Sequence, residues 1–212
     1  MERTTFYLVR HGETELNRKD CFRGASDVDL NELGKKQAEE VGEGFKNIKL
    51  DAVLSSPMKR AWYTAECIAR RKDMPIRPEP AFRNIDLGPW NGKPKEEVKK
   101  NHPELWKIWL THPESLTIEG AESLRDVQKR AWSRLLELKD EFAGKKVLIV
   151  THTTVIKPVL AAAMNIPEPY FWKFHLDHAA YAVIDYINER GWMLRGFNIT
   201  SHLTSFRSEP PF

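Results

Sequence analysis

The 212-residue chain is predicted to be an α/β protein, with three α/β/α layers, a largely parallel central sheet, an antiparallel edge strand and a small helical cap insertion. Two observations predict this class. Short apolar runs alternate along the chain with longer stretches of helical period, which is typical of a parallel sheet covered by helices on both faces. A proline-punctuated region, residues 82–120, interrupts that alternation, and we expect it to form the cap.

Five apolar runs have the length of strands in a packed sheet. They are residues 6–9, 52–55, 147–151, 181–187 and 192–197. The segment from Asn188 to Gly191 separates the last two runs and carries the signal of a tight turn. We therefore expect a hairpin there, which places the antiparallel element at one edge of the sheet.

Three longer stretches repeat apolar residues at spacings of three and four, so each has one face to bury against the sheet. They are residues 33–48, 58–68 and 124–142. Ser123 and Asp126 form a capping arrangement at the start of the third stretch. In the cap region, residues 97–109 are amphipathic and are expected to be helical.

Length and composition favour one globular domain over residues 1–212, because 41% apolar residues suffice for one sizeable core. The 33 basic and 30 acidic residues are scattered, so nucleic acid is not expected as a partner. No apolar run approaches a membrane span, and the first strand begins too early for a signal peptide, so we expect a cytoplasmic protein without a membrane partner. Cys21 and Cys67 form no Cys-x-x-Cys pair and indicate neither disulfides nor zinc.

Ligands of open α/β sheets bind beyond the carboxyl ends of the strands, where loops and helix N-termini converge. The first strand ends in Arg10 and His11, and the run at residues 147–151 is followed by His152. The second strand is followed by Arg60, one turn into a helix. The predicted topology thus brings two histidines and two arginines to one edge of the sheet.

This set of side chains suits phosphoryl transfer. Two arginines bind phosphate oxygens through directed hydrogen bonds, and their positive field disfavours protonation of a neighbouring imidazole. A neutral imidazole is a nucleophile, and its attack on phosphorus gives a phosphohistidine intermediate. No metal-type ligand set accompanies these residues, so we expect metal-independent chemistry without a cofactor, acting on a small phosphorylated metabolite or phosphate.

Seven segments, in order and at suitable spacing, match a known family. They are residues 8–14 (LVRHGET), 24–27 (GASD), 55–61 (SSPMKRA), 87–92 (LGPWNG), 120–123 (GAES), 150–152 (VTH) and 201–203 (SHL). With them the chain resembles the histidine phosphatase superfamily, in the branch that holds cofactor-dependent phosphoglycerate mutases and shorter bacterial phosphatases. The resemblance implies that His11 is the nucleophile and His152 the second pocket histidine. It also implies that Arg10, Arg60 and Asn17 hold the phosphoryl group.

One departure from the family pattern concerns the leaving group. Related phosphatases carry a proton-donating glutamate where this chain has Asn84. An amide cannot replace a carboxylic acid in this role, so we expect slow hydrolysis of alkyl esters. Asp86, two residues on, is the alternative acid. Glu13 either orients a pocket histidine or arginine or itself moves protons.

Two further departures concern the phosphate pocket. Thr153 stands where relatives usually have glycine after the second histidine, and it can still offer its backbone N–H at a helix start. Arg23 replaces the usual glutamine before Gly24 and adds a third cation, which favours a more anionic substrate. His175 and His178 lie three apart but lack the carboxylate or cysteine partners of a metal site.

The leading interpretation is a phosphomonoesterase acting on small phosphorylated metabolites through His11. Two alternatives stay open. A phosphoglycerate mutase would return the phosphoryl group to another hydroxyl, although mutases of this family tend to carry a longer insertion over the site. A phosphate-ester binding module would have lost efficient turnover through Asn84. The sequence leaves a homodimer open as well.

Overall fold

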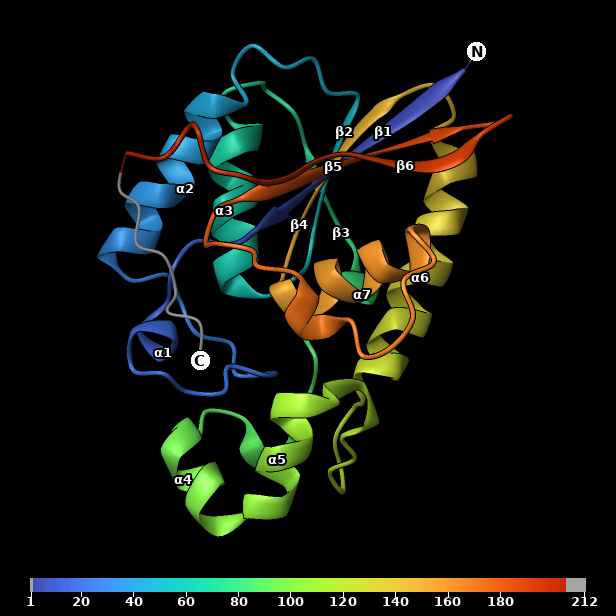
Figure 1. Ribbon diagram of the computed structural model, residues 1–212. Helices are drawn as coiled ribbons and strands as arrows, with labels where there is room; N and C mark the ends of the chain where they lie inside the picture. Colours follow the sequence, from blue (N-terminus) through green and yellow to red (C-terminus); the bar gives the residue numbers. More distant parts are fainter. Residues whose placement is uncertain (1, 205–212) are drawn as a thin grey trace.

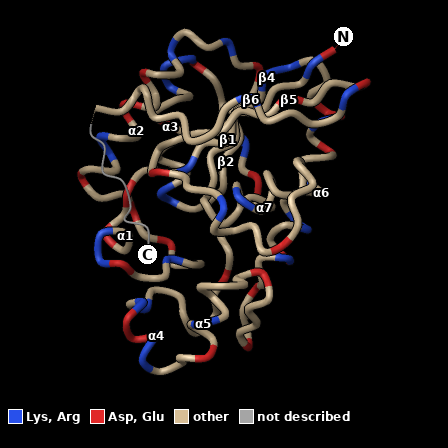
Figure 2. The backbone as a smooth tube through the Cα atoms, in the orientation of Figure 1, with Lys and Arg blue, Asp and Glu red and all other residues tan. Residues whose placement is uncertain are grey.

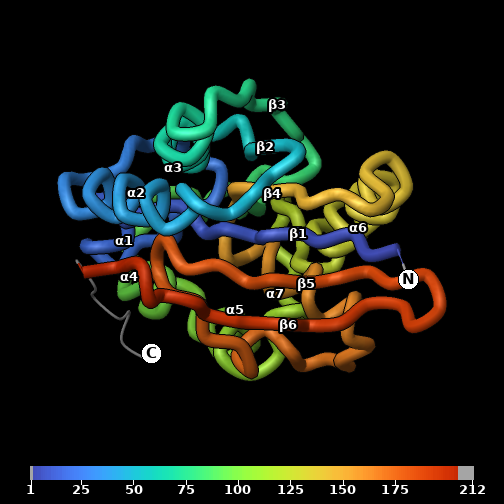
Figure 3. The backbone as a smooth tube through the Cα atoms, turned by 90° about the horizontal axis from the view of Figure 1, so that it is seen from above, coloured from blue at the N-terminus to red at the C-terminus, as the bar shows by residue number. Residues whose placement is uncertain are grey.

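A six-stranded mixed sheet forms the centre of the computed structural model, which describes residues 2–204 (Figure 1). The strands are β1 (Arg3–Arg10), β2 (Ala52–Ser55), β3 (Ile76–Pro78), β4 (Lys146–Thr151), β5 (Tyr181–Ile187) and β6 (Gly191–Ile199). They are ordered β3-β2-β4-β1-β5-β6, and Figure 3 shows the last five of these side by side from above. The first four are parallel, while β5 runs antiparallel to both β1 and β6. The predicted α/β class and antiparallel edge are confirmed.

Helices cover both faces of the sheet, with α2 and α3 on one side and α6 and α7 on the other (Figure 1). The α-helices are α1 (Glu15–Arg18), α2 (Glu32–Gly44), α3 (Lys59–Ala69), α4 (Lys95–Asn101), α5 (Pro103–Thr111), α6 (Leu124–Glu141) and α7 (Thr153–Ala163). Single 3₁₀ turns are η1 (Pro80–Phe82), η2 (Gly88–Trp90), η3 (Pro113–Ser115) and η4 (Phe171–Lys173). The capping box of Ser123 and Asp126 starts α6 as expected.

The period-two pattern of β1 explains how one strand serves two cores. Phe6 and Leu8 pack with apolar residues of α6 and α7. Tyr7 and Val9 point to the opposite face and pack with α2 and α3. All four side chains are buried, so the strand is fixed between the two helical layers and its carboxyl end is held in place.

Helix α7 is the main element that apolar periodicity did not reveal. Eight of its 11 residues are buried, and Pro158 lies inside it. A helix that is apolar on nearly all sides has no single hydrophobic face, so its sequence resembles a buried strand. The short strand β3, which ends in Pro78, was missed for lack of length.

The cap region, where a helical insertion was expected, contains the two α-helices α4 and α5. Val98 and the other residues of α4 precede a break at His102, and Pro103 begins α5. Proline has no N–H to continue a helix but is well suited to its first turn, which explains the break. Figure 1 shows α4 and α5 at the end of the molecule opposite to the N-terminus.

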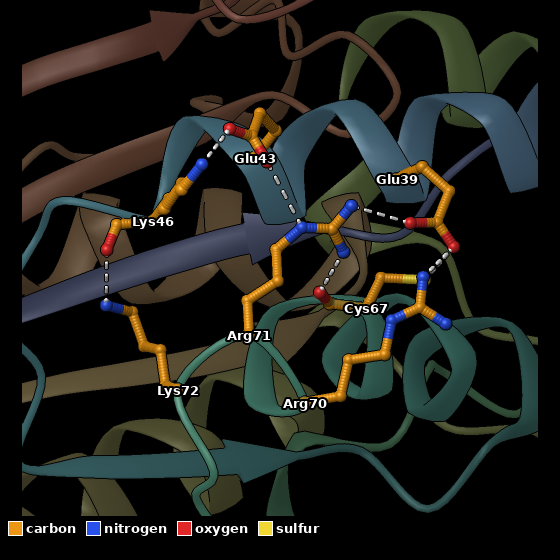
Figure 4. Close-up of polar contacts among 7 residues, drawn as sticks. All are labelled: Glu39, Glu43, Lys46, Cys67, Arg70, Arg71 and Lys72. Atoms are coloured by element: carbon orange, nitrogen blue, oxygen red, sulfur yellow. Dashed lines mark hydrogen bonds and ion pairs between the residues drawn. The ribbon is translucent and has the colours of Figure 1, made fainter.

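Helices α2 and α3 are joined by ion pairs and a thiol (Figure 4). Glu39 binds Arg70 and Arg71, with 2.8 Å from Oε2 to Nη2 of Arg71, and the thiol of Cys67 donates to Oε1 of Glu39 at 3.3 Å. Burial, followed by this contact with Glu39, raises the pKa of Cys67 to about 12. Cys67 therefore stays a protonated thiol at neutral pH and serves packing.

Basic and acidic positions are interspersed along the backbone, and both kinds occur at helices α1 and α4 (Figure 2). None of the helices between residues 2 and 204 combines the length and apolarity that a membrane span requires.

Candidate active site

The site lies where β1, β2 and β4 end. β1 and β4 are adjacent and parallel, with Arg10 in register with Thr151, so His11 and His152 leave the sheet side by side. Their ring centroids are 5.1 Å apart. β2 pairs with the other edge of β4, and Ser56, which follows it, places its Oγ 2.8 Å from Nε2 of His152. The expected convergence at the carboxyl ends of the strands is observed for both histidines.

The tautomer of His11 follows from one contact. Its Nδ1 lies 2.7 Å from the carbonyl oxygen of Gly12, and because a carbonyl can only accept, Nδ1 must carry the proton. Nε2 then holds the lone pair. Gly12 itself is required here, since a Cβ at this position would lie 2.4 Å from the carbonyl oxygen of Gly34.

Both pocket histidines are neutral at pH 7. Burial, followed by the charge of Arg60, lowers the pKa of His11 well below its usual range. The same two causes lower the pKa of His152. Each imidazole is about 1–3% exposed, so a proton on either ring would be poorly solvated. The arrangement therefore keeps the lone pair of His11 available.

Arg10 is buried and held by two acceptors beyond the strand. It donates to the carbonyl oxygen of Leu176, and its Nη2 lies 2.8 Å from Nε2 of His178. An arginine only donates, so Nε2 of His178 is the acceptor. Sequence reasoning treated His178 only as an unsuitable metal ligand, and missed its role as a partner that orients Arg10.

Arg60 is fully buried in the first turn of α3 and holds the loop that follows Arg23. Its Nη1 donates to the carbonyl oxygen of Ser26 at 2.7 Å, and its Nη2 to that of Gly24 at 3.2 Å. Burial and then the charge of Arg23 lower the pKa of Arg60 to about 9, so the guanidinium remains charged at neutral pH. Gly24 takes a positive φ of 46°, which suits glycine.

Asn84 is buried and uses both ends of its amide. Nδ2 donates to the carbonyl oxygen of Gly24 at 2.8 Å, and Oδ1 accepts from the hydroxyl of Thr154. Its side chain therefore ties the Gly24 loop to the start of α7. Thr154 lines the same cavity, and neither group at this point of the site is an acid.

Three residues proposed from the sequence are turned elsewhere. The carboxylate of Glu13 accepts from Asn31, the N-cap of α2, at 2.7 Å, and within residues 2–204 it is hydrogen-bonded to neither a pocket histidine nor a pocket arginine. Oδ1 of Asn17 accepts from the backbone N–H and hydroxyl of Thr14 in the capping box of α1. Glu13, Asn17 and Asp86 are not among the described residues that line the cavity.

Asp86 is the third of these and does not suit a proton donor. Its Oδ1 accepts from Nδ2 of Asn91 at 2.6 Å and from the N–H of Gly88 at 2.9 Å. These bonds lower the pKa of Asp86, which keeps it a carboxylate. The expectation that Asp86 could replace the missing glutamate is therefore not met by this geometry.

A cavity of about 290 Å³ opens beside the histidines. Six residues proposed from the sequence line it, namely His11, Arg23, Gly24, Asn84, His152 and Thr153. Much of the remaining wall is apolar and aromatic, and comes from α5 and from the segment around η4. Lys95, Lys157 and His175 add nitrogen groups, and none of the described lining residues is acidic.

One residue of the site that was not proposed from the sequence, Ser56, was within reach of sequence reasoning. Ser56 directly follows β2, so the rule of strand ends would have found it. Lys157 lies four residues after Thr153, but only a helix assigned to this segment puts the two on one face.

The residue types favour anion chemistry over metal binding. In the described residues, no group of three His, Cys, Asp or Glu side chains is arranged to hold a metal ion. His175 instead pairs with Asp177 at 2.9 Å. Two buried arginines, a neutral histidine with a lone pair and the N-terminus of α7 can together bind a phosphoryl group and attack it.

Comparison with known proteins agrees with this chemistry. A family model described as the histidine phosphatase superfamily (branch 1) matches residues 6–200. The chain is 36% identical over 202 residues to phosphoserine phosphatase 1 of Hydrogenobacter thermophilus, covering 95% of each protein.

Solved structures give the same result. YhfR from Bacillus stearothermophilus superposes with a TM-score of 0.88 at 30% identity, covering 94% of this chain and 98% of that one. A mutant phosphoserine phosphatase of Entamoeba histolytica in complex with phosphoserine has a TM-score of 0.85 at 28% identity, covering 94% of this chain and 99% of its own.

Proposed function

Because the chain belongs to branch 1 of the histidine phosphatase superfamily and is a phosphatase, we propose that it hydrolyses small phosphate monoesters through a phosphohistidine on His11. The observation that carries this proposal is the tautomer of His11. Its Nδ1 proton is bound to the Gly12 carbonyl, and its lowered pKa leaves the Nε2 lone pair available. The proposed route uses side chains and backbone groups of the protein together with water.

In the first step, the Nε2 lone pair forms a bond to phosphorus, and the ester P–O bond breaks with its electron pair going to the alcohol oxygen. Arg10 and Arg60 neutralise the transferring oxygens, because both are buried cations close to His11. His152 assists, since its Nδ1 is buried with no hydrogen-bond partner among the described residues. When the Ser56 hydroxyl donates to Nε2 of His152, that Nδ1 carries a proton for a phosphoryl oxygen.

In the second step, a water oxygen attacks phosphorus, the N–P bond breaks, and its electron pair returns to Nε2 of His11. Free phosphate leaves and the neutral imidazole is restored. The backbone N–H groups at the start of α7, including that of Thr153, point toward the carboxyl end of the sheet and favour the anionic product.

Protonation of the leaving alcohol is the slow part of this proposal. Asn84 occupies the acid position and is bonded at both ends of its amide. Without a general acid, alkyl esters lose a factor of about 10²–10⁴, whereas aryl esters leave readily as phenolates. Phosphate esters with good leaving groups are therefore the favoured substrates.

The test is a comparison of 4-nitrophenyl phosphate with glycerol phosphate, using the wild-type chain and His11→Ala. Wild type should release phosphate from the aryl ester, and His11→Ala should not. Acid-stable or alkali-labile phosphoenzyme, or turnover by His11→Ala, would contradict the phosphohistidine route. An alkaline-stable, acid-labile phosphoenzyme supports it.

A second candidate, a phosphate-ester binding module, is favoured by Asn84 alone. It predicts that neither ester is cleaved while both bind. The mutase alternative predicts 2-phosphoglycerate instead of free phosphate from 3-phosphoglycerate. The relatives named phosphoserine phosphatases make phosphoserine one substrate to include.

Residues 1–212 are proposed to act as one domain located in the cytoplasm, with residues 82–120 as its cap. The positions of Trp109 and Leu110 in α5 support this role for residues 82–120, because both line the cavity beside His11.

A further inference from the structure

Arg130, in the second turn of α6, holds the segment of backbone that carries Asn84. Its Nη1 donates to the carbonyl oxygen of Ala81 at 2.6 Å. Its Nη2 donates to the carbonyl oxygens of Arg83 and Asn84, at 2.9 Å and 3.2 Å. Arg130 is not among the described residues that line the cavity, so it reaches the site through this backbone and not by contact with a substrate.

Glu122 holds the same segment from its other end. Its Oε1 accepts from Nε of Arg130 at 2.8 Å, and its Oε2 accepts from Nη2 of Arg130 at 3.1 Å. Oε2 also accepts from the N–H of Asp86 at 2.9 Å, and the N–H of Glu122 donates to the carbonyl oxygen of Asp86 at 2.7 Å. The bidentate pair, in which both side chains are only 25–29% exposed, thus binds the backbone on both sides of residue 84.

The local structure explains why an arginine stands here. Residues 83–86 lie outside the helices and strands, so their backbone groups need partners from elsewhere in the fold. A guanidinium has five N–H donors in one rigid plane and can serve several carbonyl oxygens and a carboxylate together. Lysine has a flexible ammonium with three donors, so it cannot reproduce this set of contacts.

The side chain of Asn84 connects this held backbone to the pocket. Its amide donates to the carbonyl oxygen of Gly24 and accepts from the hydroxyl of Thr154. The same carbonyl oxygen of Gly24 accepts from Nη2 of Arg60. Arg130 therefore fixes the backbone end of a side chain whose other end contacts the phosphoryl pocket. A displacement of about 1 Å at such a position can cost about 10²-fold in rate.

We propose that Arg130, bound to Glu122, is a positioning residue that sets where the side chain of residue 84 meets the leaving group of the substrate. This role rests on the proposed phosphatase activity, in which position 84 serves the leaving alcohol. Capture of the phosphoryl group depends on Arg10 and Arg60 instead, which other elements supply. Loss of Arg130 should therefore affect the esters that need protonation much more than those that do not.

The experiment measures the gain of Asn84→Glu with and without Arg130. Adding Arg130→Met should remove about tenfold or more of the kcat/KM that Asn84→Glu reaches with glycerol phosphate, and less than about threefold with 4-nitrophenyl phosphate. Arg134→Met is the matched control and should keep the gain. Arg134 lies one turn further along α6, is also 25% exposed, and pairs with Glu79 instead.

Two further variants separate positioning from charge and from stability. Arg130→Lys keeps the charge without the planar donors, so it should behave like Arg130→Met. Glu122→Gln is a milder change and should shift the alkyl ester in the same direction by a smaller factor. Burial and Arg60, ahead of Arg130, lower the pKa of His152, so assays at pH 8 keep that ring neutral in every variant.

A second measurement needs no turnover. The side-chain amide of Asn84 gives a ¹⁵N NMR signal that is identified by its absence from Asn84→Glu. Arg130→Met should shift this signal and speed its hydrogen exchange with water, whereas Arg134→Met should leave both unchanged. If Asn84→Glu brings no gain in activity, this signal alone decides.

Equal losses for the two esters, or the same loss with Arg134→Met as with Arg130→Met, would overturn the positioning role. If wild type cleaves neither ester but the amide signal of Asn84 responds to Arg130→Met as expected, the phosphatase proposal fails and the positioning role stands. If wild type cleaves 4-nitrophenyl phosphate and the amide signal is unchanged in Arg130→Met, only the positioning role fails.

Discussion

The hydroxyl of Thr154 donates to the amide oxygen of Asn84, and the amide nitrogen of Asn84 in turn donates to the carbonyl oxygen of Gly24. A carboxylate at position 84 could accept from Thr154 but could not donate to Gly24 unless protonated. The contact with Gly24 would therefore favour the protonated form of an acid placed there. Burial at this position would favour it further.

Asn84→Glu should consequently raise kcat/KM for alkyl phosphates by about 10²-fold or more, with a much smaller change for 4-nitrophenyl phosphate. Phosphate release from glycerol phosphate measures the effect. Asn84→Gln is the matched control, because it has the same length as glutamate and no acidic proton. An equal gain in Asn84→Gln, or none in Asn84→Glu, would show that position 84 does not serve the leaving group.

The two pocket histidines also predict how stability depends on pH. Both have a pKa lowered by burial and by Arg60, while an unfolded chain takes up protons on them near its ordinary pKa of 6.5. Below pH 6.5 the unfolded state therefore binds more protons, and the free energy of unfolding must fall with falling pH. The slope is on the order of 1 kcal/mol per pH unit for each histidine.

Urea unfolding at pH 7.5 and at pH 5 measures this loss. His152→Gln removes one of the two groups, so its stability should depend less on pH than that of wild type over the same window. His112→Gln, which changes an exposed histidine, is the control and should keep the wild-type slope. A slope in His152→Gln equal to that of wild type would mean that His152 is not held neutral by the fold.

The convergence of Arg10, His11 and His152 could be predicted from the sequence, because parallel strands end at one edge and the residues following them must meet. The direction in which the side chain of a loop residue points could not be predicted. Glu13 is two residues from His11, yet the loop pairs Thr14 with Leu30 and directs the carboxylate to the N-cap of α2. Such long-range loop contacts leave no periodic signal in the sequence.

The wall of the cavity was hidden for a different reason. Lys157 lies in a helix whose residues are buried on nearly every side, so the segment shows no amphipathic stripe. Asp86 was a plausible acid by proximity to position 84, but its bonds to Asn91 and Gly88 depend on the turn that η2 forms. Burial and turn geometry, which are tertiary properties, decide the role of both residues.

His178 should act as a positioning residue for Arg10. His178→Ala removes the acceptor of Nη2, so the guanidinium loses part of its orientation while its charge remains. We expect kcat/KM for 4-nitrophenyl phosphate to fall by about tenfold to a hundredfold, with weaker inhibition by inorganic phosphate. His178→Gln keeps an acceptor, so it should recover part of the lost kcat/KM and part of the lost inhibition by phosphate. A variant at exposed His112 should change neither quantity.

The charge of the cavity wall makes a prediction about phosphoserine, whose α-ammonium group needs an acidic or carbonyl partner when it is desolvated. The described lining residues include three cationic side chains, Arg23, Lys95 and Lys157, and no acid. The analogue without the amine, 3-phosphonooxypropanoate, should therefore inhibit 4-nitrophenyl phosphate hydrolysis at a concentration about tenfold lower than phosphoserine does. Inhibition constants are the suitable measure, because they do not depend on slow turnover of alkyl esters.

Lys157→Met tests the origin of that difference. The variant removes one of the three lining cations, so phosphoserine should lose less affinity than its analogue, and the ratio of their inhibition constants should fall. Equal inhibition by the two compounds in wild type would mean that the ammonium finds a partner in the cavity. A ratio that stays the same in Lys157→Met would mean that Lys157 does not repel the ammonium of phosphoserine.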